Sequence, residues 1–251
     1  MVAMIPAVPP APTFAQRGFT LVELAIVLFI VALLLGGMLL PLSAQQDIRA
    51  RQETEKLLSE TRDALLGYVA VNGRLPCPDT DADGAENGSA GACTAQEGDF
   101  PYQTVGTTQS DGWGYRLRYR VASAFSTTIA LTSVGDITVF TRGDDPTTIG
   151  TTESKKESNL VTTSPAVILS VGKNGYGGMP QAGGTRNSNP TGADELLNSA
   201  GARKVFRTPT PNTSGCGDNE VEATALCEFD DQVVWLSSNT IFNRLIAAGK
   251  L

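Results

Sequence analysis

The segment that decides the fold reads Arg17-Gly18-Phe19-Thr20-Leu21-Val22-Glu23-Leu24 and opens an almost unbroken apolar run that ends at Leu42. Residues 19–42 contain a single ionisable side chain, Glu23. About 20 apolar residues suffice for a helix to cross the hydrocarbon core of a bilayer, so we predict a transmembrane helix at residues 19–42. An unpaired carboxylate inside a membrane costs several kcal/mol, and we therefore expect Glu23 to meet a cationic partner.

The segment before the apolar run has a different composition. Residues 1–18 are rich in proline and alanine and carry one charged side chain, Arg17. Four prolines within the first 12 residues argue against a helix, so residues 1–18 are predicted to be a leader. A secretory signal is cut after its apolar core, whereas the Gly18-Phe19 junction precedes the run. Cleavage at this junction would leave the anchor on the protein.

The hexapeptide Gly18-Phe19-Thr20-Leu21-Val22-Glu23 resembles the processing site of type IV prepilins and type II secretion pseudopilins. The resemblance implies that a prepilin peptidase cuts after Gly18 and that Phe19 becomes the N-methylated terminus. It also implies that Glu23 neutralises the terminal amine of an adjacent subunit during assembly of a helical fibre. The implied location is the bacterial inner membrane, crossed once, with the globular domain in the periplasm. Once the subunit is assembled in a fibre, its implied location is periplasmic or extracellular. An uncleaved signal anchor with a stray acid is the alternative.

The helix is expected to continue beyond the membrane. Residues 43–72 form an amphipathic pattern in which charged side chains separate apolar ones. The apolar positions are Ile48, Leu58, Leu65, Leu66 and Val69. They keep no heptad over several repeats, which disfavours a coiled-coil dimer. Asn72-Gly73 is suited to end the helix in a left-handed cap.

The composition excludes several classes of function. The 251-residue chain has a net charge of -7, an unfavourable balance for binding a phosphate backbone, so no nucleic-acid partner is expected. The chain contains no histidine, which removes the commonest general base and the commonest metal ligand. No pair of acidic residues has a spacing that singles out a catalytic acid and base, so we expect no enzymatic activity.

One loop after the helix has the composition of a cation site. Three aspartates alternate before a glycine in Asp79-Thr80-Asp81-Ala82-Asp83-Gly84, as in the opening of a loop that wraps Ca²⁺. The predicted ligand set is Asp79, Asp81, Asp83, Glu86 and Asn87. Glu97, Asp99 and Asp111 are candidates to complete it if the chain folds back. A solvated acidic loop without Ca²⁺ is the alternative.

The cysteines indicate an exported domain. Cys77 and Cys93 flank the acidic loop, and Cys216 and Cys227 form a second local pair. Four cysteines allow three connectivities. Short-range loop closure favours the one that contains these two local pairs. Neither pair has zinc-site spacing, and disulfides imply an oxidising compartment such as the periplasm. Free buried thiols are the alternative; a C-terminal disulfide loop at Cys216 would resemble those of pilins.

The remainder of the chain is predicted to be rich in β-structure. Tyr115 to Val121 alternates apolar and basic residues, which favours a half-buried antiparallel strand whose arginines form a solvated face or pair with the acidic loop. The preceding Asp111-Gly112-Trp113-Gly114 is similar to an Asp-x-Trp-Gly element of pseudopilins. Further predicted strands are Thr127–Val134, Ile137–Thr141, Ala166–Val171 and Gln232–Leu236. Of these, Ala166–Val171 is apolar on both faces and is expected to be central.

A short last helix and two long loops complete the prediction. Ser237-Ser238-Asn239 is expected to cap the helix, with Ile241, Leu245 and Ile246 facing inward. The polar stretches 142–164 and 172–198 are predicted to be long loops.

The sequence therefore predicts an α+β, pilin-like fold in four parts: a leader (1–18), a transmembrane helix (19–42), its amphipathic continuation (43–72) and a periplasmic β-rich domain (73–251). The long N-terminal helix is expected to pack on an antiparallel sheet. The predicted function is that of a structural subunit, a minor pilin or pseudopilin. The alternative is a membrane-anchored adhesion or binding module that uses the same leader.

Overall fold

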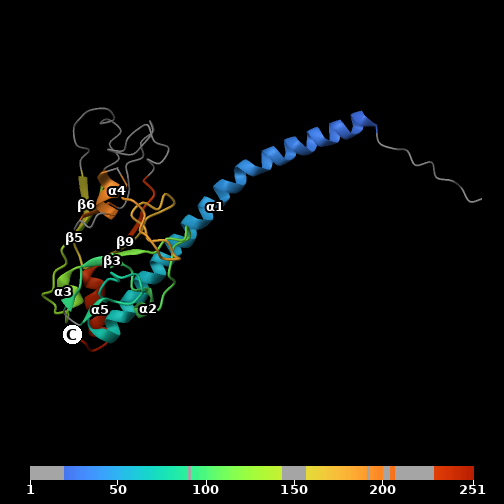
Figure 1. The fold of residues 1–251 in the computed structure, drawn as a ribbon. Coiled ribbons are helices and arrows are strands. Elements are labelled where there is room, and N and C mark those ends of the chain that lie inside the picture. Colours follow the sequence, from blue (N-terminus) through green and yellow to red (C-terminus); the bar gives the residue numbers. More distant parts are fainter. Residues whose placement is uncertain (1–19, 90–91, 143–156, 191–192, 200–203, 207–228) are drawn as a thin grey trace, which may run out of the picture. The chain divides into compact units, whose positions relative to one another are not determined.

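The computed structural model describes residues 20–89, 92–142, 157–190, 193–199, 204–206 and 229–251. The chain divides into two compact units, Met1–Gln46 and Asp47–Leu251, which are considered separately. Helix α1 (Leu21–Asn72) contributes to both units and ends at Asn72, as predicted (Figure 1). Gly73 follows with a positive φ of 71°, the left-handed conformation that the Asn-Gly sequence favours.

The described part of the first unit is the beginning of α1. Its large apolar side chains from Leu21 to Leu34 are exposed, with Leu21 itself 85% accessible. Among the described residues, no helix is both long enough and apolar enough to cross a membrane. The transmembrane segment at residues 19–42 stays a prediction from the sequence.

The central sheet of the second unit has four strands in the order β3-β4-β7-β9. These strands are β3 (Glu97–Asp99), β4 (Arg118–Val121), β7 (Ala166–Ser170) and β9 (Gln232–Trp235). All three pairings are antiparallel, with Arg118 opposite Leu169 and Ile168 opposite Val234. Every residue of β7 is buried, so the predicted central strand is confirmed.

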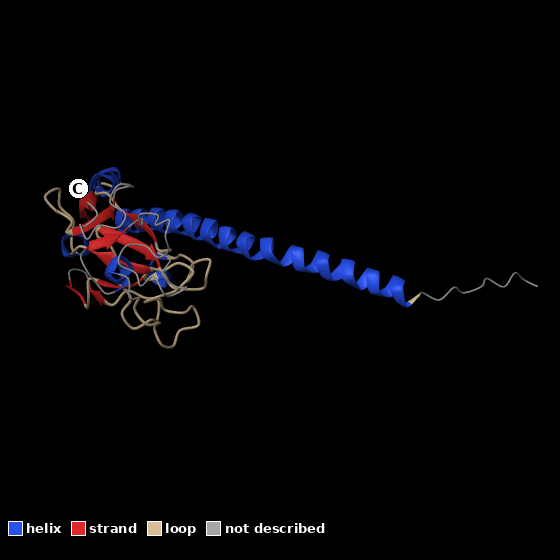
Figure 2. Ribbon diagram, turned by 90° about the horizontal axis from the view of Figure 1, so that it is seen from above, coloured by secondary structure: helices blue, strands red, loops and turns tan. Residues whose placement is uncertain are grey.

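A second sheet has the order β6-β5-β8, made of β6 (Glu157–Ser164), β5 (Ile137–Arg142) and β8 (Lys204–Phe206). The β5–β6 pair is antiparallel, but β5 and β8 are parallel, which the sequence did not indicate. A small antiparallel hairpin joins β1 (Gly88–Ser89) to β2 (Ala92–Cys93). Figure 2 shows the strands of this unit gathered together, with helices beside them.

The core lies on both faces of the four-stranded sheet. On one face, Tyr119, Val121 and Ile168 pack with the second half of α1 and with α5 (Ser238–Ala247). On the other face, Val167 and Leu169 pack with β5 and β8 of the second sheet. Alternate residues of β7 therefore serve two different cores, which explains why this strand is apolar on both faces.

Three short helices complete the unit: α2 (Tyr102–Val105), α3 (Ser123–Ser126) and α4 (Ala193–Ser199). The predicted α+β architecture, with a helix on an antiparallel sheet, is confirmed. On α1 the predicted inward positions Leu58, Leu65, Leu66 and Val69 are buried, but Ile48 is exposed.

Several local predictions were wrong. Thr127–Val134 contains no strand, because this segment leaves α3 as a turn whose Leu131 and Val134 are exposed. The predicted loop 142–164 contains β6, because its Thr-rich and Ser-rich sequence pairs with β5. The predicted loop 172–198 contains most of α4. On α5, Ile241 and Leu245 face inward as predicted, whereas Ile246 is exposed because it lies one residue beyond the inward face.

Candidate functional site

The first candidate site is the start of α1, where Glu23 forms a reciprocal cap with Thr20. The amide and hydroxyl of Thr20 both donate to Glu23 Oε2 at 3.0 Å, and the amide of Glu23 donates to Thr20 Oγ1 at 3.2 Å. This is the capping-box arrangement of a threonine followed three residues later by a glutamate. Glu23 therefore has a local role, because its carboxylate satisfies the Thr20 amide at the exposed helix start. Sequence analysis missed the role of Thr20, although the Thr-x-x-Glu spacing is a readable signal for it.

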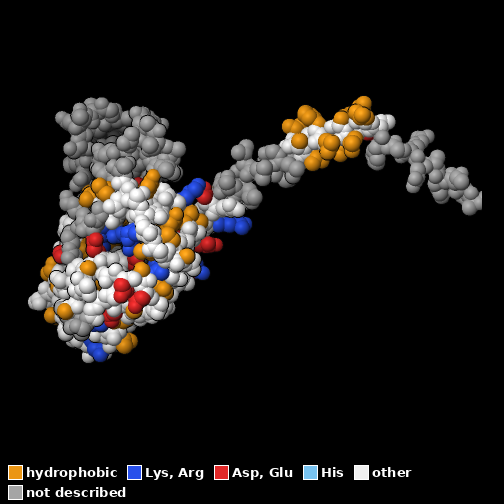
Figure 3. All heavy atoms as spheres, in the orientation of Figure 1, with side chains coloured by type: hydrophobic (Ala, Val, Ile, Leu, Met, Phe, Trp, Pro, Cys, Tyr) orange, Lys and Arg blue, Asp and Glu red, His pale blue; other side chains and the backbone are white. Residues whose placement is uncertain are grey.

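Apolar side chains surround Glu23 on the same helix. Figure 3 shows them as a hydrophobic group over the start of α1. They include Leu24, Val27, Leu28 and Phe29, each more than half exposed. A helix that is apolar on all sides is normally covered by lipid or by other helices. Gly18 and Phe19, the predicted cleavage and methylation residues, lie outside the described residues.

The second candidate site is the acidic loop, where the structure brings three of the five predicted ligands together. Carboxylate oxygens of Asp79, Asp81 and Asp83 lie within 4.8 Å of one another. Asp79 is buried and accepts hydrogen bonds from the amides of Asp81, Ala82 and Gly84 at 2.7–3.2 Å. Burial raises the pKa of Asp79, against these amide hydrogen bonds, which lower it. Asp81 and Asp83 are exposed, and binding of Ca²⁺ by this loop stays a prediction.

The other two predicted ligands have different neighbours. Glu86 receives two hydrogen bonds from Arg74 and one from the hydroxyl of Tyr68, so its carboxylate is turned toward the end of α1. Asn87 donates its side-chain amide to Asp81 at 3.1 Å and accepts from Thr80. Asn87 thus lies beside the three aspartates, whereas Glu86 does not join them.

The residues proposed to complete the shell have other partners. Asp99 pairs with Arg186 at 2.8 Å, and its backbone bridges that of Asp79. Asp111 accepts hydrogen bonds from Ser170 Oγ and from the amides of Trp113 and Tyr115. Burial raises the pKa of Asp111, while these hydrogen bonds lower it. Asp111 therefore fixes the turn of the Asp-x-Trp-Gly element against β7.

A disulfide joins Cys77 to Cys93, with the two Cα atoms 5.3 Å apart. It closes the acidic loop and ties it to the β1–β2 hairpin, confirming the predicted pairing of these two residues. Cys216 and Cys227 lie outside the described residues, so their predicted disulfide stays a prediction.

The arginines of the alternating segment do not form the solvated face that we predicted, because Arg116, Arg118 and Arg120 are all buried. Arg116 donates to the carbonyl of Ala82 at 2.6 Å and lies 3.9 Å from Asp79, which confirms the alternative prediction of a pair with the acidic loop. Arg118 donates to the carbonyl of Gly177 at 3.0 Å. These guanidinium groups thus bind backbone carbonyls of the acidic loop and of the segment that follows β7.

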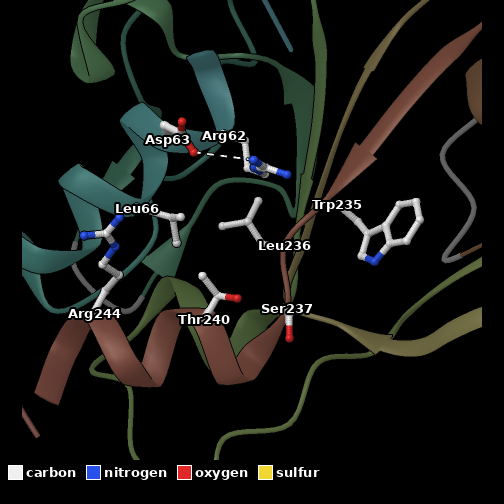
Figure 4. Close-up of a pocket in the computed structure, with 8 residues that line it drawn as sticks. All are labelled: Arg62, Asp63, Leu66, Trp235, Leu236, Ser237, Thr240 and Arg244. Atoms are coloured by element: carbon white, nitrogen blue, oxygen red, sulfur yellow. Dashed lines mark ion pairs between the residues drawn. The ribbon is translucent and has the colours of Figure 1, made fainter. Parts of the chain in front are cut away.

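A surface hollow of about 370 Å³ lies between α1, the end of β9 and α5 (Figure 4). Arg62 and Asp63 form an ion pair at 3.6 Å on its α1 side, and Arg244 of α5 faces them. Leu66 and Leu236 supply apolar side chains between these charges. None of the described residues that line the hollow is a buried acid, base or nucleophile.

The N-terminal segment has a recognisable relative among known protein families. Residues 13–39 match the family model of the prokaryotic N-terminal methylation motif. This motif is the hallmark of the leaders of type IV pilins and pseudopilins. The match covers Gly18, Phe19, Thr20 and Glu23, and so includes both members of the capping box. No curated protein and no solved structure matched the chain.

The prepilin-type motif has consequences for processing and location. It implies processing by a prepilin peptidase and assembly with other pilin subunits. It is typical of proteins that are anchored in a membrane or lie outside the cell. The acidic loop, the disulfide and the buried arginines lie outside the matched residues.

Proposed function

We propose that this chain is a minor pilin or a pseudopilin, a structural subunit of a type IV pilus or of a type II secretion fibre, and that it is not an enzyme. The observation that carries this proposal is the N-terminal methylation motif at residues 13–39. From Leu21 onward the motif belongs to α1, whose large apolar side chains are exposed from Leu21 to Leu34. Such a surface supports an association with lipid before assembly and with neighbouring helices afterwards.

The proposed assembly step depends on a charge that cleavage creates. Cutting after Gly18 would make Phe19 the new N-terminus and place a positive amine four residues before Glu23. In an apolar environment the carboxylate of one subunit and the amine of the next compensate one another at short range, because each is costly alone. The capping box with Thr20 would hold the Glu23 side chain at the helix start until that partner arrives.

The second unit supports a location outside the cytoplasm. Its Cys77–Cys93 disulfide is of the kind that persists in an oxidising compartment. We propose that this unit lies in the periplasm while the N-terminal helix is in the inner membrane, and that it faces outward once the subunit is in a fibre. The fixed turn at Asp111 and the disulfide-closed loop support a rigid domain carried by the fibre.

The direct test is the mass of the mature N-terminus. The full chain is produced in cells that contain either an active prepilin peptidase or its inactive variant, and the membrane fraction is analysed by mass spectrometry. With the active enzyme we expect a chain that begins at Phe19 and carries one additional methyl group. With the inactive enzyme we expect residues 1–18 to remain. An intact leader in cells where the same peptidase cleaves another prepilin would overturn the proposal.

A further inference from the structure

A second cluster of three carboxylates is buried beside the start of β9. Glu195 belongs to α4, and Asp230 and Asp231 directly precede β9. All three side chains are buried, and one carboxylate oxygen of each lies within 4.8 Å of the other two. Acidic side chains are almost never fully buried unless they are paired or bind a metal, so three of them at one place form a candidate site for a cation.

Two asparagines orient the carboxylates. Asn174 donates its side-chain amide to Glu195 Oε1 at 2.6 Å and its backbone amide to Asp230 Oδ2 at 2.8 Å. Asn198 donates its side-chain amide to Asp231 Oδ2 at 2.8 Å. These amide donors fix the positions of the carboxylate oxygens.

One oxygen of the cluster lacks a donor within the described residues. Asp231 is only 7% exposed, and its Oδ1 atom is shielded from solvent without a hydrogen bond from the described part of the chain. A buried acceptor that makes no hydrogen bond costs about 1–3 kcal/mol, and more when it is charged. Oδ1 is therefore an oxygen that gains from a ligand and loses no existing contact by binding it.

Two arginines that attract Asp231 also lie beside another acid. Arg118 and Arg120 attract Asp231 from β4. Their guanidinium nitrogens also lie 4.0 Å and 3.6 Å from Glu97, which belongs to β3. Arg120 in addition donates to the carbonyls of Leu197 and Asn198 at 2.8 and 2.6 Å. Neither guanidinium is directed to Asp231 alone.

We propose that Glu195, Asp230 and Asp231 bind one Ca²⁺ ion between α4 and the start of β9. Calcium prefers oxygen ligands at about 2.3–2.6 Å, so opposite ligands of one ion are about 4.8 Å apart. Three oxygens within 4.8 Å of one another are therefore within reach of a single ion. Softer metals prefer the nitrogen and sulfur ligands that this cluster lacks. This site is separate from the acidic loop, goes beyond the proposed function and does not depend on fibre assembly.

The consequence of the proposed site is a change in stability with a sign that can be measured. With Ca²⁺ bound, the three carboxylates are ligands that tie α4 to the start of β9. Asp231→Asn removes one of these ligands. The rise in melting temperature between chelator and Ca²⁺ should therefore be smaller for this variant than for the unchanged chain.

The test uses the full chain in detergent after treatment with a chelator. Bound calcium is measured by atomic emission after equilibrium dialysis against CaCl₂, and the melting temperature is measured by near-ultraviolet circular dichroism with chelator, CaCl₂ or MgCl₂. Asp231→Asn is compared with a matched control in the acidic loop. This loop control is the double variant that combines Asp81→Asn and Asp83→Asn. Glu195→Gln is a second variant of the proposed site, for use if Asp231→Asn does not fold.

We expect CaCl₂ to raise the melting temperature of the unchanged chain and of the loop control. We expect Asp231→Asn or Glu195→Gln to weaken the Ca²⁺ affinity of this site at least tenfold and to abolish most of the shift. Two outcomes would overturn the proposal. One is an absence of any Ca²⁺-dependent shift in the unchanged chain, and the other is a shift that only the loop control abolishes.

Discussion

Arg74 and Glu86 form a two-armed ion pair that ties the end of α1 to the disulfide-closed loop, with both nitrogen–oxygen distances at 2.8 Å. The same carboxylate accepts from the amide of Cys77 and from the hydroxyl of Tyr68, each at 2.9 Å. Burial together with Glu86 raises the pKa of Tyr68 to about 12, so this hydroxyl stays protonated and remains a donor. Glu86 therefore connects three parts of the chain: Tyr68 of α1, Arg74 just after this helix, and Cys77 of the disulfide.

Replacing Glu86 by glutamine should lower the free energy of unfolding by about 1–3 kcal/mol at pH 7, because the partly buried guanidinium of Arg74 loses its charged acceptor. Burial disfavours the ionised form of Glu86, but hydrogen bonds from Arg74, Cys77 and Tyr68 outweigh it and set its pKa below the ordinary value of 4.5. A lowered pKa means that the unfolded chain binds the proton more tightly. This stabilisation is therefore present above about pH 4.5 and lost as the pH falls through the folded pKa.

The measurement is urea unfolding of the full chain in detergent between pH 3 and pH 7. The difference between the unchanged chain and Glu86→Gln should shrink as the pH falls. Glu60→Gln is the control, because Glu60 forms only an exposed pair with Lys56 on α1, and such pairs contribute less than about 1 kcal/mol. Equal effects of the two variants at pH 7 would contradict the assigned role of Glu86.

Removal of the disulfide by Cys77→Ser with Cys93→Ser should cost about 3 kcal/mol of stability, the value for closing a loop of about 15 residues. The two cysteines are 16 residues apart, and the acidic loop lies between them. Urea unfolding with and without reductant tests this. Reductant should destabilise the unchanged chain and have a smaller effect on the double variant. An effect of the same size in both would show that this disulfide does not contribute.

Two glycines on or against α1 should respond to alanine in opposite directions. Gly112 donates its amide to Thr54 Oγ1, and a Cβ atom at this position would lie 2.9 Å from the Cα atom of Ala50. Gly112→Ala should therefore cost about 1–3 kcal/mol, because the opposing atoms belong to a helix backbone that cannot yield easily. A Cβ atom added at Gly67 would meet no other part of the chain within 4 Å, so Gly67→Ala should stabilise the helix by about 0.5–1 kcal/mol. Equal shifts in melting temperature would contradict the close approach at Gly112.

The elements that sequence analysis found are those whose pattern is local. The end of α1 at Asn72 follows from an Asn-Gly pair, and the central position of β7 follows from an unbroken apolar run. The Cys77–Cys93 pairing follows from short loop closure. Each of these signals lies within a few residues or a single short loop.

The features that sequence analysis missed depend on contacts between distant segments. Arg118 and Arg120 alternate with apolar residues as in a solvated strand, yet carbonyls of Gly177 and Leu197 cover them from 59 and 77 residues further along the chain. The parallel pairing of β5 with β8 likewise joins segments that no turn connects. Glu195 reaches Asp230 and Asp231 only because α4 and β9 are neighbours in the folded unit.

The role of Glu23 can be divided into a charge and a helix cap by one pair of substitutions. Glu23→Ala removes both the charge and the hydrogen bonds with Thr20. Glu23→Gln removes the charge but keeps an acceptor, because glutamine also serves at this position of a capping box. If the carboxylate compensates the amine of a neighbouring subunit, both variants should insert into the membrane normally and enter fibres at least tenfold less than the unchanged chain.

The measurement is the amount of the chain in sheared fibres relative to the amount in the membrane fraction. Glu53→Ala is the control, because Glu53 is an exposed acid of the same helix beyond the apolar run. It should assemble normally. Recovery of assembly by Glu23→Gln, with loss only in Glu23→Ala, would assign Glu23 to the cap with Thr20 and contradict a charge pair. A neutral side chain at this depth should insert at least as easily as a carboxylate, so loss of both variants from the membrane fraction would also contradict the prediction.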